Sequence, residues 1–260
     1  MAVSQAKTVI AVVIVILYLA LTYADWWMAI VGSVLIVVLS KLAWSNRGTQ
    51  VVGLGMSARQ IGVSLLLLVV VLMASLWIVQ AIAAREGAHF VPVYEDEKRC
   101  TRLIHTLGQT LNEEMVLGAL LLRFIQGRLK STRPFAISAG VAAVFSLVHY
   151  LFYGLRPPQA PNYGTLSVAT LVSLFLVGVV RNNCILGTGH IGYAWAIHMG
   201  WNIAFIDGSF YWPETGAKLV EPSMFNMILG DRALVIATSI LMVLSLLPYA
   251  RKKESGNRRI

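Results

Sequence analysis

Long runs of apolar residues, separated by short polar stretches, make up most of this chain. Runs of about 20 apolar residues are typical of α-helices that cross a membrane. The pattern therefore predicts an all-α, polytopic membrane protein with about eight transmembrane helices. We expect these helices over residues 8–24, 27–44, 61–84, 106–125, 134–153, 165–180, 190–206 and 232–249.

The composition supports this class of protein. Of the 260 residues, 57% are hydrophobic and 13% are charged, whereas a soluble domain carries about 25% charged residues. A membrane β-barrel would show short segments of alternating polarity, and the runs here are continuous. The net charge of +9 does not indicate nucleic acid as a partner, because the basic residues gather at the ends of apolar runs, where they determine membrane topology.

The basic residues also predict an orientation in the membrane. With both termini in the cytoplasm, most of the 21 Lys and Arg residues lie on the cytoplasmic side, as the positive-inside rule requires. In this arrangement Arg181 lies in a cytoplasmic connection between the sixth and seventh helices. The C-terminal tail would lie near anionic headgroups; its basic residues are Arg251, Lys252, Lys253, Arg258 and Arg259.

We expect a single membrane domain over residues 1–260. Residues 1–104 would form three peripheral helices and an outer loop, and residues 105–206 would form the core helices that carry the site. Residues 207–260 would form a second outer loop, the last helix and the basic tail.

Among the polar residues inside the predicted helices, five lie at depth on the core helices, where such groups are costly and therefore indicate function. Glu113 and Glu114 lie in the first half of the fourth helix, and His149 lies near the end of the fifth. His198 and Asn202 lie in the seventh. Carboxylates can also simply favour a helix N-terminus, and a single histidine can hydrogen-bond a neighbouring carbonyl. The occurrence of the whole set on three helices favours one polar intramembrane site.

The spacing of these residues places them relative to one another. His198 and Asn202 are four residues apart, as are Phe145 and His149, so each pair lies on one helix face. The two glutamates are about 100° apart around their helix, so we expect one to face the site and the other to pack beside it. Alternating the helices across the membrane puts the whole set in the outer half, away from the cytoplasm.

This set of groups can hydrolyse a peptide bond directly. A carboxylate beside an imidazole can hold a water molecule and take its proton, while an Asn amide and a second His can donate hydrogen bonds to the resulting oxyanion. No serine or cysteine with a base beside it is evident at this depth, so a covalent intermediate is less natural. We expect neither a cofactor nor a metal ion.

The same motifs carry a family resemblance. Two adjacent glutamates, followed by FxxxH and HxxxN on later core helices, resemble the CPBP family, which comprises CAAX proteases and bacteriocin-processing enzymes. These are glutamic intramembrane endopeptidases. The resemblance covers roughly residues 105–206 and includes the TGH stretch at 188–190.

The resemblance implies a role for each matching residue. Glu113 would activate water together with His149, and His198 and Asn202 would bind and polarise the scissile carbonyl. The residues implied in supporting roles are Glu114 and Phe145.

One position departs from the family's first motif. The family has an Arg four residues after the second glutamate and then a Gly, whereas this chain has Gly118 and Ala119. Arg123 cannot substitute from the same helix, because nine residues from Glu114 is about 180° around the axis. The chain therefore resembles a divergent member, in which Glu114 is either protonated or paired with another residue. The candidate partners are Arg102, His105 and Arg181.

The resemblance implies an intramembrane peptidase that cleaves near a membrane-associated C-terminus or a sorting signal. The expected partners are membrane lipid and a protein or peptide with a hydrophobic or lipidated C-terminal segment, and no nucleic acid. The expected location is the bacterial inner (plasma) membrane.

Two alternatives stay open at this point. A zinc-dependent membrane protease could use a glutamate and two histidines as ligands, although no HExxH motif is present and no separate base would remain. A non-catalytic scaffold or a transporter could also bury charged residues, although inverted repeats and paired broken helices, common in transporters, are not evident.

Overall fold

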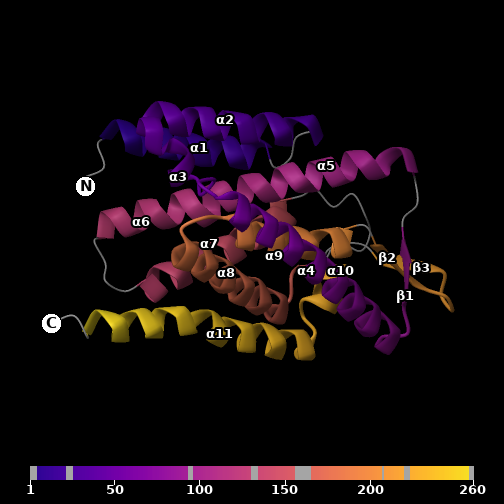
Figure 1. Cartoon of the computed structure of the whole chain (residues 1–260). Coiled ribbons are helices and arrows are strands. Elements are labelled where there is room, and N and C mark those ends of the chain that lie inside the picture. Colours follow the sequence, from indigo (N-terminus) through magenta and orange to yellow (C-terminus); the bar gives the residue numbers. More distant parts are fainter. Residues whose placement is uncertain are drawn as a thin grey trace.

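The computed structural model is a bundle of long helices with a small sheet at one end (Figure 1). It describes residues 5–21, 26–92, 96–129, 134–155, 165–206, 208–219 and 223–257. The long helices are α1 (Gln5–Leu21), α2 (Trp26–Trp44), α4 (Ala58–Arg85), α5 (Asp96–Glu113), α7 (Pro134–Leu155), α8 (Val168–Thr188), α9 (Gly192–Ile206) and α11 (Arg232–Asn257). The π-helical segment η2 (Glu114–Leu120) and then α6 (Leu121–Leu129) continue α5 without a break. Shorter helices are η1 (Ser45–Arg47), α3 (Gly48–Val51) and α10 (Ser223–Ile228).

A helix lies over each of the eight predicted runs, but fewer of the described helices qualify as membrane spans. Four segments are long and apolar enough to cross a membrane: Trp27–Val51, Ala58–Arg85, Pro134–Leu151 and Val168–Thr188. Two more helices are apolar but shorter. Neither the continuous α5–η2–α6 helix nor α9 is among these six, and these two helices carry most of the polar site residues. The predicted number of eight spans therefore stays a prediction.

Side chains on the outside of the bundle fit a lipid environment. On α4, the large apolar residues Leu66, Met73 and Trp77 are each more than 60% exposed. A water-soluble monomer rarely exposes a continuous apolar face of this kind. Lipid tails solvate such a face without cost.

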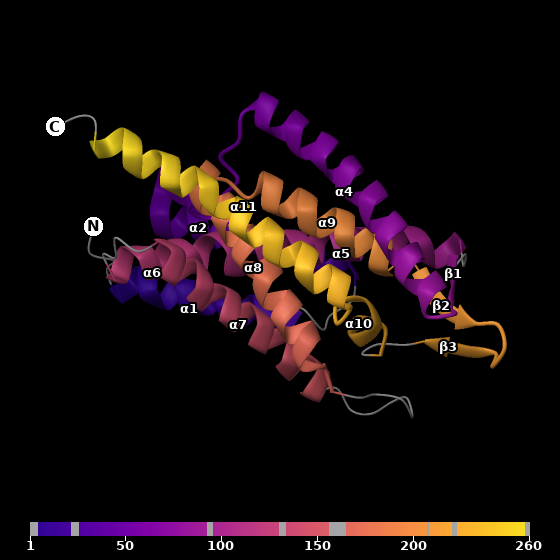
Figure 2. The ribbon, with the colours of Figure 1, turned by 90° about the horizontal axis from the view of Figure 1, so that it is seen from below.

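The two ends of the bundle differ. The helix α1 begins and α11 ends at one end, whereas the sheet lies at the other (Figures 1 and 2). This arrangement is the one that cytoplasmic N- and C-termini require. In the basic tail, Arg258 and Arg259 lie outside the described residues.

The sequence did not predict the small sheet. Its strands are β1 (His89–Pro92), β2 (Gly208–Trp212) and β3 (Ala217–Leu219), paired antiparallel in that order. Trp212 ties it to the end of α4, because its Nε1 donates to the carbonyl of Glu86 at 3.1 Å. The two predicted outer loops therefore pair with each other.

The helix α8 joins the core. It packs between α7 and α11 and also contacts α9 (Figure 2). Three consecutive buried polar residues, Arg181, Asn182 and Asn183, reach three different neighbours. Asn182 donates to the carbonyl of Ser138 on α7 at 2.9 Å, and Asn183 donates to Ser245 on α11 at 2.8 Å.

The predicted position of Arg181 was wrong. We placed the end of this helix at residue 180, because the polar triplet interrupts the apolar run. The helix instead continues to Thr188, and Arg181 is only 3% exposed. Interhelical hydrogen bonds offset the cost of burying the two asparagines, and Arg181 has charged partners.

Close contact between α7 and α8 depends on a small residue. A Cβ atom added to Gly178 would lie 3.0 Å from the Cβ of Ala142 and 3.2 Å from the ring of Phe145. We expect Gly178→Val to lower the free energy of unfolding by about 1–3 kcal/mol through overpacking. Thermal unfolding in detergent, followed by circular dichroism, measures this loss.

Gly140 is the matched control for this prediction. It lies on the exposed face of α7, and a Cβ atom added there meets nothing within 4 Å. Gly140→Val should therefore unfold close to the wild-type temperature. Equal melting temperatures for the two variants would contradict the tight α7–α8 contact.

Candidate active site

The two glutamates lie at the middle of the longest continuous helix. Glu113 is the last residue of α5, and Glu114 opens the π-helical segment η2. Every residue of η2 is buried. Such π segments are rare and are frequently found at functional sites.

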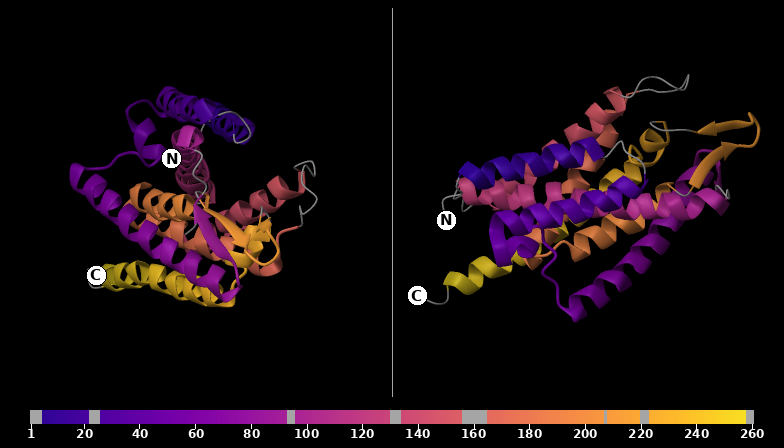
Figure 3. Two further views of the ribbon diagram at one scale, coloured as in Figure 1. Left: turned by 90° about the vertical axis from the view of Figure 1, so that its right-hand side faces the viewer. Right: turned by 90° about the horizontal axis from the view of Figure 1, so that it is seen from above.

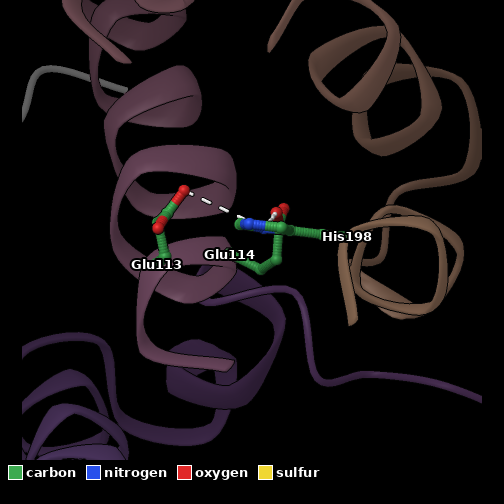
Figure 4. A group of neighbouring side chains, drawn as sticks. All are labelled: Glu113, Glu114 and His198. Atoms are coloured by element: carbon green, nitrogen blue, oxygen red, sulfur yellow. Dashed lines mark hydrogen bonds and ion pairs between the residues drawn. The ribbon is translucent and has the colours of Figure 1, made fainter. Parts of the chain in front are cut away.

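Both glutamates contact the same two groups, a guanidinium and an imidazole. Arg181 Nη1 donates to Glu113 Oε1 at 3.0 Å and lies 3.4 Å from Glu114 Oε1. His198 reaches across from α9 (Figure 4), and its Nδ1 lies 2.9 Å from Glu114 Oε1 and 3.9 Å from Glu113 Oε1. We expected only one carboxylate to face the site. That expectation was wrong, because Oε1 of each glutamate lies within 3.9 Å of both Arg181 Nη1 and His198 Nδ1.

This cluster is almost completely withdrawn from the surroundings. The exposed fraction of the side chain is 0% for Glu114, 3% for Arg181, 7% for Glu113 and 13% for His198. Charges buried to this extent have to be paired. Two carboxylates, one guanidinium and one imidazole balance to zero net charge when one proton is shared between Glu114 and His198.

Either location of that proton leaves the same free donor on His198. If the imidazole carries it, both ring nitrogens are protonated and Nδ1 donates to the carboxylate. If Glu114 carries it, the carboxylic acid donates to Nδ1, and the neutral ring keeps its hydrogen on Nε2. In both cases His198 Nε2 can donate to a further group.

His149 is oriented by its own helix. Its Nδ1 lies 2.9 Å from the carbonyl oxygen of Phe145, one turn earlier in α7. A carbonyl only accepts, so Nδ1 donates and the Nε2 of the neutral ring is left as an acceptor. The ring also packs against that of Phe145, with centroids 4.5 Å apart.

Asn202 and His198 make two contacts, one helical turn apart, between α9 and the α5–η2 helix. Asn202 Nδ2 donates to Thr110 Oγ1 at 3.2 Å, and His198 contacts Glu114 one turn away. Both pairs of partners are four residues apart on their own helix, so the two faces match in register. Sequence analysis missed Thr110, because a single hydroxyl in an apolar run gives no signal.

Phe145 packs at the centre of the arrangement. The guanidinium carbon of Arg181 lies 4.1 Å from the centroid of its ring, within the range of a cation–π contact. The ring of His198 meets it edge-on at 6.3 Å. The predicted residues from three helices therefore come together, and a fourth helix, α8, contributes the cation.

The helix bounds locate the site residues along their helices. The glutamates lie midway along Asp96–Leu129, because α5 begins ten residues before the predicted start at 106. His149 lies in the second half of α7, and Arg181 lies in the second half of α8, which runs the opposite way (Figure 1). The predicted location of the site in the outer half of the membrane stays a prediction.

The cluster could also offer ligands to a metal ion. Glu113, Glu114 and His198 each have one ligand atom within 4.8 Å of the others. Arg181 Nη1 approaches one oxygen of each of these carboxylates, at 3.0 and 3.4 Å. A guanidinium at this distance repels a second cation, so the arrangement suits hydrogen bonding among protein groups better than metal binding.

Comparison with known proteins agrees with the motifs. Residues 100–204 match a family model described as Type II CAAX prenyl endopeptidase Rce1-like. The matched segment runs from α5 to α9 and contains every residue of the cluster described above. Searches of curated proteins and of solved structures give no match. The match confirms the resemblance seen in the sequence and supports membership of the CPBP family of CAAX proteases for the segment that carries the site.

Proposed function

We propose that the protein is a glutamic-type intramembrane endopeptidase, in which Glu113 activates a water molecule for direct attack on a peptide bond. Members of the matched family are intramembrane proteases that act on proteins or peptides in membranes. The observation that carries the glutamic mechanism is the buried cluster of Glu113, Glu114, Arg181 and His198. It holds charged groups in fixed positions inside an apolar bundle.

The two oxygens of Glu113 have different surroundings. Oε1 accepts from Arg181, whereas Oε2 accepts no hydrogen bond within the described part of the chain. We assign the water molecule to Oε2 and to Nε2 of His149, whose ring packs against the same Phe145 ring that Arg181 and His198 contact. Two acceptors of this kind orient a water molecule and leave its oxygen lone pair directed at the substrate.

The reaction then requires no covalent intermediate. The water oxygen bonds to the carbonyl carbon while its proton passes to Glu113, which gives a tetrahedral oxyanion. The bond from carbon to nitrogen breaks as Glu113 returns the proton to the leaving amine. The carboxylate is regenerated at the end of the cycle.

His198 and Asn202 are suited to stabilise the oxyanion. His198 Nε2 carries a hydrogen in both charge arrangements described above. Asn202 Nδ2 has two hydrogens, of which one is donated to Thr110. Two donors one helical turn apart on α9 can therefore converge on a single oxygen, as in other oxyanion holes.

We further propose a substrate and a location. The substrate would be a protein or peptide with a hydrophobic or lipidated segment, cut near a membrane-associated C-terminus or a sorting signal. The exposed apolar face of α4 and the four candidate spans support a location in a membrane; we propose the bacterial plasma membrane, with cytoplasmic termini. Residues 105–206 would form the catalytic core of a single membrane domain.

The direct test replaces the proposed base and one oxyanion donor. We expect Glu113→Gln to reduce cleavage by about 10²–10⁴-fold, the usual contribution of a general base. Asn202→Ala should reduce it by roughly 10²–10³-fold, the usual effect of losing one oxyanion donor. Mass spectrometry of the C-termini of membrane and surface proteins, in cells that express each variant, measures the cleavage.

Glu86→Gln serves as the matched control, because it makes the same chemical change at an exposed glutamate directly after α4. Cells with this variant should process the same substrates as wild type. Unchanged processing with Glu113→Gln would exclude the glutamic mechanism.

Metal removal tests the rival zinc mechanism. Because the Arg181 guanidinium approaches an oxygen of both glutamates and would repel a metal ion there, we expect purified enzyme to keep its cleavage rate, within about twofold, in a strong chelator. The readout is cleavage of a substrate peptide identified by the mass spectrometry above. Loss of activity with the chelator, followed by recovery on adding Zn²⁺, would instead support a metalloprotease.

A further inference from the structure

In this chain, the space beside residue 118, where the family's first motif has an Arg, is filled by a side chain from a neighbouring helix. A Cβ atom added to Gly118 would lie 2.7 Å from Cδ1 of Ile185 on α8 and 2.9 Å from Oε2 of Glu114. Neither distance is tolerated without movement of the neighbour. The space beside Glu114 is therefore filled by the Ile185 side chain of α8, and any side chain at residue 118 would require Ile185 and Glu114 to shift.

The same face of α8 supplies a cation. Arg181 precedes Ile185 by four residues, so the two side chains lie one above the other on the helix surface. Ile185 packs against the backbone at Gly118, and Arg181 reaches the carboxylates of Glu113 and Glu114 at 3.0 and 3.4 Å. The absence of a side chain at 118 allows the close approach that brings Arg181 to the glutamates.

We propose that Arg181 is the positioning residue that takes the place of the missing motif Arg. Its approach from α8 requires that residue 118 has no side chain, as in Gly118. The proposal rests on the proposed peptidase function for its catalytic consequence. Arg181 acts through Glu113 and Glu114, and it does not touch the substrate.

The effect of Arg181 follows from charge and geometry. Two adjacent buried carboxylates repel each other, and His198 alone could compensate only one of them. Arg181 binds Oε1 of Glu113 and leaves Oε2 for the water molecule. Its stacking on Phe145, which is 3% exposed, fixes the guanidinium in place. Without the Arg181 cation, Glu113 would hold a proton, and it could not then act as a base.

The first experiment removes the cation. Arg181→Met should lower kcat by about 10–100-fold with little change in KM, the range seen when a partner that orients a reactive group is lost. Arg181→Lys should recover part of the loss, because a cation remains. Arg123→Met is the matched control: Arg123 lies on α6 and donates to the carbonyl of Gly189, away from the glutamates. It should keep wild-type kcat.

The second experiment moves the cation to the motif position. The triple variant Gly118→Arg, Ile185→Ala, Arg181→Met opens space beside Glu114 and supplies an Arg from residue 118. We expect at least tenfold higher kcat than Arg181→Met in the Ile185→Ala background. A folded triple variant with no recovery, or wild-type kcat in Arg181→Met, would overturn the proposal.

A stability measurement separates this proposal from the peptidase assignment. If Arg181 compensates Glu114, Arg181→Met should lower the melting temperature by several degrees in the wild-type chain and by much less in Glu114→Gln. Non-additivity of this kind reports direct coupling between the two residues. Additive changes would overturn the proposal whether or not the protein cleaves a peptide. Coupling without any cleavage would support the ion pair and refute the proposed function.

Discussion

The contact between the Arg181 guanidinium and the paired carboxylates of Glu113 and Glu114 is the interaction on which the rest of the site depends. Carboxylates inside an apolar bundle are costly unless they are paired and hydrogen-bonded. Here one nitrogen contacts an oxygen of each, at 3.0 and 3.4 Å. With both Oε1 atoms engaged, the free oxygen of Glu113 and the free nitrogens of the two histidines have defined directions.

The fold serves this contact by bringing four helices to one point. The α5–η2–α6 helix carries the acids, α7 carries His149 on the stacked ring of Phe145, and α9 carries the two proposed oxyanion donors. The helix α8 supplies the cation and is held by its neighbours through Asn182 and Asn183. The peripheral helices α1 and α2 lie against this core without contributing to the cluster (Figure 3).

Much of this arrangement was predictable from the sequence, for identifiable reasons. Helical periodicity and the cost of buried charge were sufficient to identify Glu113, His149, His198 and Asn202, because each polar residue interrupts an apolar run. The same reasoning misplaced Arg181, since a polar triplet at the end of an apolar window looks like the start of a loop. Whether α8 continues depends on hydrogen bonds to α7 and α11, which no local pattern records. The small sheet was missed for a similar reason, because its strands are short and β1 pairs with β2 across more than 100 residues of sequence.

The tight fit at Gly118 limits how such a site can change over generations. An Arg at 118 would require the side chains of Ile185 and Glu114 to move from their present positions. Losing either cation before gaining the other leaves two acids facing one imidazole. A change from one arrangement to the other therefore also requires a shorter or displaced side chain at Ile185. A single substitution therefore does not easily exchange one position of the cation for the other, although the acids and the proposed chemistry stay the same.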